Sequence, residues 1–443
     1  MKTLRRLLLQ LLVLISTALF FSWASWNLGA GKQSLPEPWS RWIAAFAQYP
    51  QTLTQTIEQL NKAQDHRPFQ LLVDRRTTLG FPARQQFPAS SDPGYLLLSG
   101  VDPTAKKSVV QLIVIATGKT LHQWQVNFED VAKDFVATRV FPSRSDASFS
   151  RIMHPKLLSD GGLLLTVDGV LMRLDVNSQI LWRQRGEYHH SIELDADNHI
   201  WVSPVTHGFY AANPMLEQTL RDDAIAELSL DGQLISKISF SKILLENGFR
   251  GLLLGQSGDV TSQDRIHLNE IAPALEDGVA WKKGDLFISC RHLSTVFLYR
   301  PSTGKILWHQ TGPWLNQHDV NILDGSRISI FGNDVISGAP REQAFLAPQT
   351  HNQVYVYDFA TRQITKPFET ILDQYPVQTV WEGRARILGP DALFIEDTNN
   401  ARHLMFSRQK LLWSRLNVYD EQWLGMVSWS SYLRAEELPV FQP

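Results

Sequence analysis

The sequence predicts an all-β fold, a six-bladed β-propeller over about residues 67–443, preceded by an apolar N-terminal segment. From about Phe69 onward, short β-rich runs alternate with turn signals, and a hairpin pattern of apolar strand, turn and further strand, often with a Trp, recurs six times. Units that cannot bury both faces alone stack in a closed ring, which also removes exposed sheet edges. The six copies are Val110–Val126, Leu163–Gly186, Ala224–Phe240, Asp285–Gly312, Gln353–Phe368 and Ala392–Leu416.

Composition agrees with one large globular domain and excludes several classes of protein. Hydrophobic residues make up 44% of the 443 residues and charged residues 19%, which is typical of a chain with a large core rather than of a disordered one. The formal net charge of -2 offers no broadly basic surface, so no nucleic-acid partner is expected. A single cysteine, Cys290, excludes an intramolecular disulfide and a cysteine-based metal centre.

Residues 1–30 are expected to form a membrane anchor or a signal sequence. Basic residues precede an uncharged run from Leu7 to about Leu28, and a span of roughly 17–25 residues crosses a bilayer. The basic flank should stay cytoplasmic, which predicts a single-pass inner-membrane protein whose propeller faces the periplasm or the cell exterior. Ser22-Trp23-Ala24 offers a cleavage pattern, so a cleaved signal peptide is the alternative. Residues 31–66 show helical spacing of apolar residues and are expected to form a short stalk.

Histidines return at the start of four successive repeats. His154 starts the second repeat, His189-His190 the third, His267 the fourth and His318 the fifth. In a propeller the first strand of each blade lines the central channel, so residues at its start converge near the axis. The recurrence therefore predicts a pore lined by imidazoles, which exchange protons near neutral pH, act as nucleophiles and bind metals.

Arg291 ends an apolar run in the same repeat as His267. A guanidinium recognises paired anionic oxygens, such as those of phosphate, sulfate or carboxylate. Because no dense acidic cluster accompanies the histidines, the combination favours a sulfuryl or phosphoryl group over a bare metal ion. Each histidine alone is also consistent with a hydrogen-bonded core residue, and Arg291 alone with a salt bridge. Insertions near residues 203–222 and 241–263 are expected to form loops over one mouth of the channel.

Several of these stretches together resemble the bacterial arylsulfate sulfotransferase family over roughly residues 150–335. The resemblance implies a six-bladed periplasmic propeller that moves a sulfuryl group from one phenol to another, without a cofactor or a nucleotide sulfate donor. The stretches that carry it are His189-His190-Ser191, Asp264-Arg265-Ile266-His267-Leu268-Asn269, Ser289-Cys290-Arg291-His292, Thr303-Gly304-Lys305-Ile306-Leu307-Trp308, Gln317-His318-Asp319 and Phe331-Gly332-Asn333.

Carried over by position, the resemblance implies that His318 attacks sulfur and holds a covalent sulfohistidine. The other site residues would stabilise charge on the sulfuryl oxygens or bind substrate, and no metal is implied. The implied partners are an aryl sulfate donor and a phenolic or hydroxyl acceptor. The supporting residues are His190, His267 and Arg291 for catalysis and Asn269, His189 and His154 for substrate binding.

The chain also departs from the family's pattern. Ser191 stands where an acidic residue often follows the paired histidine, Arg265-Ile266 replaces an expected aromatic context, and Cys290 has no disulfide partner. Two other functions therefore stay open. One is a non-catalytic envelope propeller that binds glycan or protein, and the other is a metal-dependent lyase or hydrolase that uses the same histidines.

Overall fold

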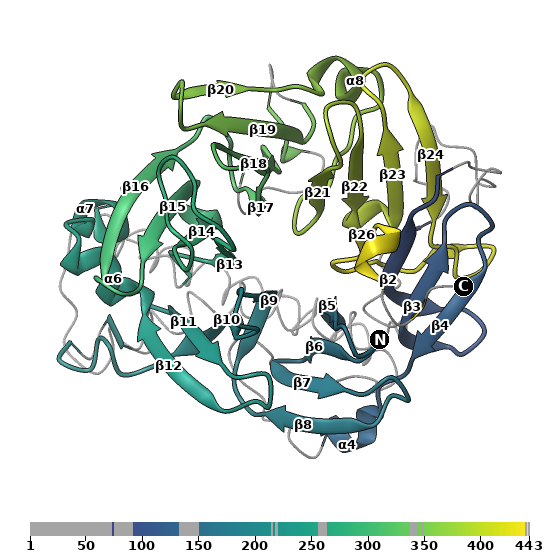
Figure 1. Cartoon of the computed structure of the whole chain (residues 1–443), viewed down its shortest axis with the longest axis horizontal. Helices are drawn as coiled ribbons and strands as arrows, with labels where there is room; N and C mark the ends of the chain where they lie inside the picture. Colours follow the sequence, from purple (N-terminus) through teal and green to yellow (C-terminus); the bar gives the residue numbers. More distant parts are fainter. Residues whose placement is uncertain are drawn as a thin grey trace, which may run out of the picture. The chain divides into compact units, whose positions relative to one another are not determined.

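Six four-stranded antiparallel sheets surround a common axis in the computed structural model of the chain (Figure 1). The all-β, six-bladed fold expected from the sequence is thereby confirmed. The anchor or signal sequence and the stalk lie outside the described residues. Within the described part of the chain, no helix has the length and apolar character needed to span a bilayer. The structure describes residues 73–74, 92–132, 150–213, 216–217, 220–255, 264–336, 343–346, 350–438 and 441.

Each blade runs from an inner strand beside the axis to an outer strand, and we number the blades in chain order. Blade 1 contains β26 (Ser431–Leu433), β2 (Tyr95–Asp102), β3 (Lys107–Val114) and β4 (Thr120–Trp124). Blade 2 contains β5 (Ile152–Leu157), β6 (Leu163–Val167), β7 (Val170–Leu174) and β8 (Ile180–Gln184). Blade 3 contains β9 (Tyr188–Leu194), β10 (Ile200–Thr206), β11 (Asp222–Leu228) and β12 (Leu234–Ser239).

Blades 4 to 6 follow the same order from the axis outward. Blade 4 contains β13 (Leu268–Pro273), β14 (Leu286–Cys290), β15 (Thr295–Arg300) and β16 (Lys305–Thr311). Blade 5 contains β17 (His318–Ile322), β18 (Arg327–Gly332), β19 (Gln353–Asp358) and β20 (Gln363–Thr365). Blade 6 contains β21 (Arg384–Ile387), β22 (Leu393–Asp397), β23 (Arg402–Phe406) and β24 (Leu411–Leu416).

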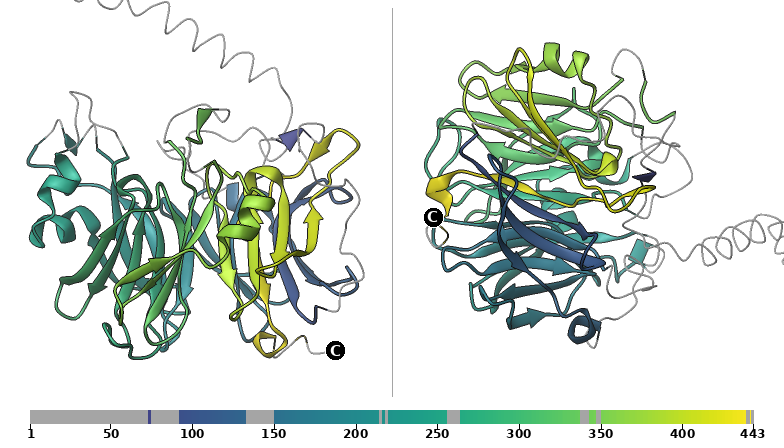
Figure 2. Two further views of the ribbon diagram at one scale, coloured as in Figure 1. Left: turned by 90° about the horizontal axis from the view of Figure 1, so that it is seen from above. Right: turned by 90° about the vertical axis from the view of Figure 1, so that its right-hand side faces the viewer.

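Short helices and one further strand pair complete the described structure. Seen from the side, the strands of the blades run between two opposite faces, where the connections gather (Figure 2). The pair joins β1 (Val73–Asp74) to β25 (Trp423–Leu424). The helices are α4 (Phe128–Ala132), α6 (Phe240–Glu246), α7 (Arg250–Leu254) and α8 (Glu369–Gln374), and the 3₁₀ turns are Arg291–Leu293, Thr398–Asn400 and Ala435–Glu437.

Blade 1 closes the ring by combining the two ends of the propeller sequence. Its inner strand β26 pairs with β2 so that Leu96 lies opposite Tyr432. The Tyr432 hydroxyl donates a 2.9 Å hydrogen bond to Asp92, just before β2. Such closure removes the free sheet edges on which open β-structures aggregate. The strand is only three residues long, which is why the repeat pattern of the sequence did not reveal it.

The recurring tryptophans of the sequence lie on outer strands, and each of four donates its indole N–H to the next blade. Trp124 donates to the Gly161 carbonyl and Trp182 to the Leu230 carbonyl. Two more continue the pattern around the ring, Trp308 to the Tyr357 hydroxyl and Trp413 to Asp92. The Trp182 ring also explains a glycine, because a Cβ on Gly232, whose φ is +85°, would lie 2.7 Å from that ring.

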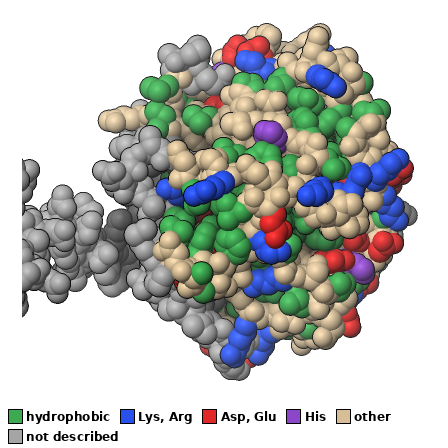
Figure 3. All heavy atoms as spheres, turned by 90° about the vertical axis from the view of Figure 1, so that its left-hand side faces the viewer, with side chains coloured by type: hydrophobic (Ala, Val, Ile, Leu, Met, Phe, Trp, Pro, Cys, Tyr) green, Lys and Arg blue, Asp and Glu red, His purple; other side chains and the backbone are tan. Residues whose placement is uncertain are grey.

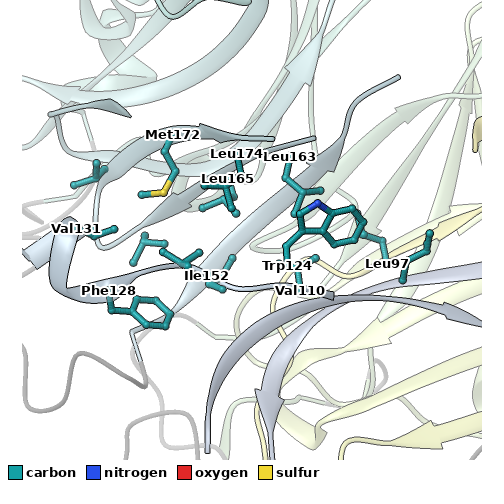
Figure 4. Close-up of a cluster of buried hydrophobic side chains, with 14 of the residues drawn as sticks. Leu97, Val110, Trp124, Phe128, Val131, Ile152, Leu163, Leu165, Met172 and Leu174 are labelled. Atoms are coloured by element: carbon teal, nitrogen blue, oxygen red, sulfur yellow. The ribbon is translucent and has the colours of Figure 1, made fainter. Parts of the chain in front are cut away.

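Apolar side chains fill the wedges between blades. The wedge between blades 1 and 2 buries Trp124 completely, together with Leu97, Val110, Leu163 and Met172 (Figure 4). The outer face around α6, α7, β12 and β16 instead mixes charged and hydrophobic side chains (Figure 3). There the strand residue Leu234 is 56% exposed. The stability of the propeller therefore depends on contacts between blades more than on its outer rim.

We expect Trp124→Ala to lower the free energy of unfolding by about 3–5 kcal/mol, because it leaves a cavity between two blades. The exposed Leu234→Ala is the matched control, and its cost should stay within about 0.5 kcal/mol. Urea unfolding followed by circular dichroism measures both. Similar losses in the two variants would contradict the importance of the wedge between blades.

Candidate active site

The site lies at the face where the inner strands begin. In an antiparallel four-stranded blade, the first strand begins at the face where the second strand connects to the third. His190 lies in β9, His267 immediately precedes β13, and His318 begins β17. Two arginines lie in such connections, Arg221 between β10 and β11 of blade 3 and Arg291 between β14 and β15 of blade 4. Side chains from three blades therefore meet at one end of the channel.

His190, His267 and His318, the histidine trio, come together as the recurrence predicted. The ring of His190 lies 4.7 Å from that of His267 and 6.0 Å from that of His318, centroid to centroid. One nitrogen of each ring lies within 4.8 Å of the other two. Of the two candidates in the third repeat, His190 is the one in the trio, and His189 stands behind it.

His154 also lies on an inner strand and lines the channel, but it does not join the trio. Its Nδ1 accepts a 2.9 Å hydrogen bond from the backbone N–H of Ile192 in the next blade. That bond turns Nε2 toward Glu193, whose carboxylate is 3.9 Å away. The ring of Trp429 contacts both His154, at 5.6 Å, and His190, at 5.4 Å.

A closed ring of hydrogen bonds fixes the protons of two trio members. His267 Nδ1 lies 2.6 Å from the Asp264 carboxylate, which only accepts, so this nitrogen donates. At the other end, His189 Nε2 lies 2.7 Å from Arg221 Nη2 and 3.2 Å from Asp223 Oδ1, the oxygen to which Arg221 Nε donates. With three neutral rings, the donation from His267 to Asp264 makes this nitrogen the acceptor of the Arg221 N–H.

Between these ends, His189 Nδ1 donates to His190 Nδ1 over 2.7 Å, and His190 Nε2 donates to His267 Nε2 over 3.2 Å. Arg221 Nη1 closes the ring on Asp264 at 3.2 Å. All three histidines are neutral in this arrangement.

His318 is held in the tautomer that leaves Nε2 free. Asn333 donates its amide to the carbonyls of Thr379, at 3.2 Å, and Glu382, at 2.8 Å, which fixes the orientation of the amide. Its Oδ1 must therefore accept the 2.7 Å hydrogen bond from His318 Nδ1. Among the described residues the side-chain partner of His318 is bonded through Nδ1, and the backbone carbonyl of Asn316 lies close enough to the ring to favour its protonated form. A neutral imidazole with an available Nε2 lone pair is a nucleophile.

Burial keeps the trio uncharged. Desolvation, and then the charge of Arg291, lowers the pKa of His318 to about 3. Desolvation also lowers the pKa of His190 and of His267 well below its usual range, with smaller contributions from His267 and His292 respectively. These histidines therefore stay neutral at physiological pH, since an unperturbed histidine titrates near 6.5.

Arg291 supplies a positive charge that the described residues do not neutralise directly. Its side chain is buried, and desolvation lowers its pKa to about 10, so it stays charged at neutral pH. Nη1 donates to His292 Nε2 at 2.6 Å and Nη2 to the Val380 carbonyl at 3.4 Å. Its buried Nε has no hydrogen-bond partner, and within the described ranges no carboxylate pairs with the group. Such a guanidinium is suited to an anion.

Asn269 acts on the segment that precedes His318. It is fully buried, and its Nδ2 donates a 2.7 Å hydrogen bond to the backbone carbonyl of Gln317. It therefore connects the inner strand of blade 4 to the residue before His318.

The two insertions expected over the mouth of the channel, near residues 203–222 and 241–263, behave differently from one another. The first ends at Arg221, which enters the site, whereas the described part of the second forms α6 and α7, which pack into the core beside β13.

Four residues of the site were not predicted from the sequence, namely Arg221, Asp264, Asn333 and Trp429. One backbone signal unites several site positions, because a residue with positive φ stands at or beside the start of every inner strand. These residues are His154 (49°), His190 (59°), His267 (48°), Asp319 (56°), Glu382 (60°) and Trp429 (56°). Trp429 thus occupies in blade 1 the kind of position that histidines occupy elsewhere, a signal visible only once β26 is known.

Comparison with solved structures finds several chains that match most of this one at low sequence identity. A protein of unknown function from Bacteroides caccae has a TM-score of 0.47 and 13% identity, covering 77% of this chain and 100% of its own. Kuenenia stuttgartiensis hydrazine synthase gives 0.37 and 12%, covering 75% and 81%. The Dos1 propeller gives 0.38 and 10%, covering 75% and 74%.

No relative is found among curated proteins. The arylsulfotransferase (ASST) family, by contrast, matches residues 154–415, which span more than half of the chain and contain the trio, Arg291 and Asn333. The chain belongs to the arylsulfotransferase family.

Proposed function

We propose that this chain transfers a sulfuryl group from an aryl sulfate to a phenolic or hydroxyl acceptor through a covalent intermediate on His318. Family membership supports a sulfotransferase-like enzyme. The observation that carries the finer proposal is the neutral His318, with Nε2 free and Nδ1 bonded to Asn333, close enough to Arg291 for that charge to lower its pKa.

In the first half of the reaction, the Nε2 lone pair of His318 forms a bond to sulfur. The bond from sulfur to the aryl oxygen breaks, and the phenolate leaves with its electron pair. Nδ1–H keeps its bond to Asn333, so positive charge that develops on the ring is stabilised by an amide oxygen. Arg291 offers its unpartnered Nε–H to the sulfuryl oxygens.

His267 stays neutral while the phenolate leaves, and it is the best placed base for the acceptor hydroxyl in the second half of the reaction. In the neutral ring of hydrogen bonds, its Nε2 accepts from His190, and Asp264 accepts from its Nδ1. One added proton would make Nε2 a donor, and the Asp264 carboxylate would stabilise the resulting imidazolium. Release of that proton to water returns His267 to its neutral form.

The second half reverses the displacement at sulfur. The acceptor hydroxyl gives its proton to His267 while its oxygen attacks sulfur, and the bond between sulfur and His318 Nε2 breaks. The first phenolate leaves as an anion and takes a proton from water, and His267 later returns the acceptor's proton to water, so the cycle balances without a cofactor. Splitting the transfer into two displacements is the general advantage of a covalent intermediate.

A metal-dependent lyase or hydrolase is the second candidate, because the trio has the spacing of a metal site. The buried guanidinium of Arg291 disfavours a cation there and favours an anion. The two functions differ in their response to a chelator, which removes activity only if a metal is bound. A non-catalytic propeller would show neither transfer nor a covalent adduct.

We also propose that residues 1–30 attach the propeller to the inner membrane on its periplasmic side. The support is the basic flank before the uncharged run from Leu7 to about Leu28. Alkaline carbonate should leave the full-length protein in the membrane fraction. Release of the protein, or a mature chain that begins at Ser25, would replace the anchor with a cleaved signal peptide.

His318→Ala should abolish both transfer and the covalent adduct, because it removes the atom that bonds to sulfur. Mass spectrometry after incubation with p-nitrophenyl sulfate detects the adduct, and release of p-nitrophenol to an acceptor measures transfer. His199→Ala, at a half-buried position just before β10 where the ring is bonded to Glu227, is the matched control and should keep both. Full transfer activity in His318→Ala would overturn the assignment.

Arg291→Ala, and likewise His267→Ala, should slow transfer by about 10²–10³, the usual cost of one charge-stabilising group, and Asn269→Ala should slow it by releasing the backbone before His318. Arg291→Lys should recover only part of this loss, since an ammonium cannot grip two oxygens at once. Steady-state rates with p-nitrophenyl sulfate measure each variant. Complete rescue by lysine would mean that Arg291 provides charge alone.

The rate of adduct formation should stay nearly constant between about pH 7.5 and about pH 5. The reason is that the pKa of His318 is about 3 rather than 6.5, so the ring stays neutral in this range. A depressed pKa keeps the histidine neutral until the pH falls through the depressed value. Single-turnover quenching should therefore show less than about a threefold decrease across this range. A decrease of about tenfold per pH unit below 6.5 would show that an ordinary, exposed histidine attacks sulfur.

A further inference from the structure

A second polar site lies along the inner strands, apart from the trio. A cavity of about 670 Å³ is lined there by His154, Glu193 and Glu270, and no member of the trio lines it. The three residues belong to β5, β9 and β13, the inner strands of three successive blades. One nitrogen or oxygen of each lies within 4.8 Å of the other two.

Glu270 is the unusual member of this group. Its side chain is only 2% exposed, and neither carboxylate oxygen has a hydrogen-bond partner of good geometry. The Ser191 hydroxyl lies close enough to favour the charged form, yet burial and the charge of Glu193 raise the pKa of Glu270 well above its usual range. A buried carboxylate without a partner costs free energy unless a cation or a proton compensates it.

The nearby cations are engaged elsewhere. Arg384 donates to Asp319 at 3.1 Å and to the Ser431 hydroxyl at 3.0 Å. Lys156 pairs with one oxygen of Glu193 and is about one-third exposed. The other oxygen of Glu193 is the one that lies 3.9 Å from His154 Nε2. Of the two glutamates, Glu270 is thus the one that no described cation contacts directly.

The tautomer of His154 decides which cation fits. Because Nδ1 accepts the Ile192 N–H, the proton of the neutral ring is on Nε2. Nε2 is therefore a hydrogen-bond donor, and it has no partner. A protonated nitrogen cannot ligate a metal, so only the two carboxylates offer ligand atoms. Oxygen ligands completed by water are typical of hard divalent cations such as Mg²⁺, Mn²⁺ and Ca²⁺.

We propose that Glu193 and Glu270 bind a hydrated hard divalent cation in the channel, with His154 donating a hydrogen bond from Nε2 to the bound water or carboxylate. Glu193 follows His190 by three residues and Glu270 follows His267 by three residues. The cation joins β9, which contains His190, to β13, which directly follows His267. It therefore fixes the separation of blades 3 and 4 at the axis.

Titration calorimetry of the chelator-treated full chain with MnCl₂, MgCl₂ and CaCl₂ tests the site directly. We expect saturable binding of one equivalent of at least one of these cations. Glu270→Gln keeps the shape of the side chain and removes its charge, and should weaken binding by at least about tenfold. Lys156→Ala removes the ammonium that competes for Glu193 and should tighten binding. No saturable binding, or unchanged affinity in Glu270→Gln, would overturn the proposal.

A control variant and a second measurement distinguish this site from the trio and from the acidic cluster of blade 3. Glu227→Gln is the matched control, since Asp195, His199 and Glu227 have the same spacing but Glu227 is already bonded to His199 at 2.8 Å. The control should leave the affinity unchanged.

Thermal unfolding is the second measurement. In the wild-type chain the bound cation should raise the midpoint of unfolding, and Glu270→Gln should lose this rise. In chelator, Glu270→Gln should unfold no earlier than the wild-type chain. A cation-dependent rise that persists in Glu270→Gln but disappears in His318→Ala would assign the binding to the trio instead.

Discussion

Desolvation of the histidines at the axis is the constraint on which the chemistry of this protein depends. A buried imidazole that cannot be charged must donate from one nitrogen and accept at the other. Arg221, which only donates, and Asp264, which only accepts, therefore set the direction of every bond through His189, His190 and His267. Asn333 sets the direction at His318 in the same way. The site thus has one nitrogen, His318 Nε2, that is both unprotonated and uncommitted.

The same residues that build the site also carry backbone strain. A non-glycine residue in the left-handed region costs roughly 1–2 kcal/mol, and one stands at or beside the start of each inner strand. Register shifts occur at these points in blades 2 to 5, as between His318 and Val320, and change the direction of the first side chains. The strain persists because the blades hold the strands in place from outside, through buried wedges and through bonds such as that from Trp124 to Gly161. Rigid packing at the rim is thus a condition for convergence at the centre.

The six-fold pattern and the histidines could be predicted from sequence because both are local signals that recur. His318 and His267 stand at the start of a repeat in the sequence and at the start of an inner strand in the structure. The separation of His154 from the trio has a different origin. Its direction depends on the backbone of Ile192 in the next blade, which no local pattern describes. The residues that were missed are similarly non-local. Asn333 matters because carbonyls 46 and 49 residues away fix its amide. Trp429 reaches the axis only because a three-residue strand at the end of the chain becomes the inner strand of the first blade.

The two ends of the channel differ in charge, and the neutrality of the histidines makes that difference possible. At the trio, Arg291 has no carboxylate partner among the described residues, whereas Glu270 has no cation partner farther along the inner strands. Within the described ranges, no hydrogen bond or ion pair joins Arg291 to Glu270. The Trp429 ring instead contacts His154 as well as His190 and His318, and all three imidazoles are buried and uncharged. An apolar and neutral layer therefore separates a site suited to an anion from one suited to a cation, so each can bind its ligand without neutralising the other.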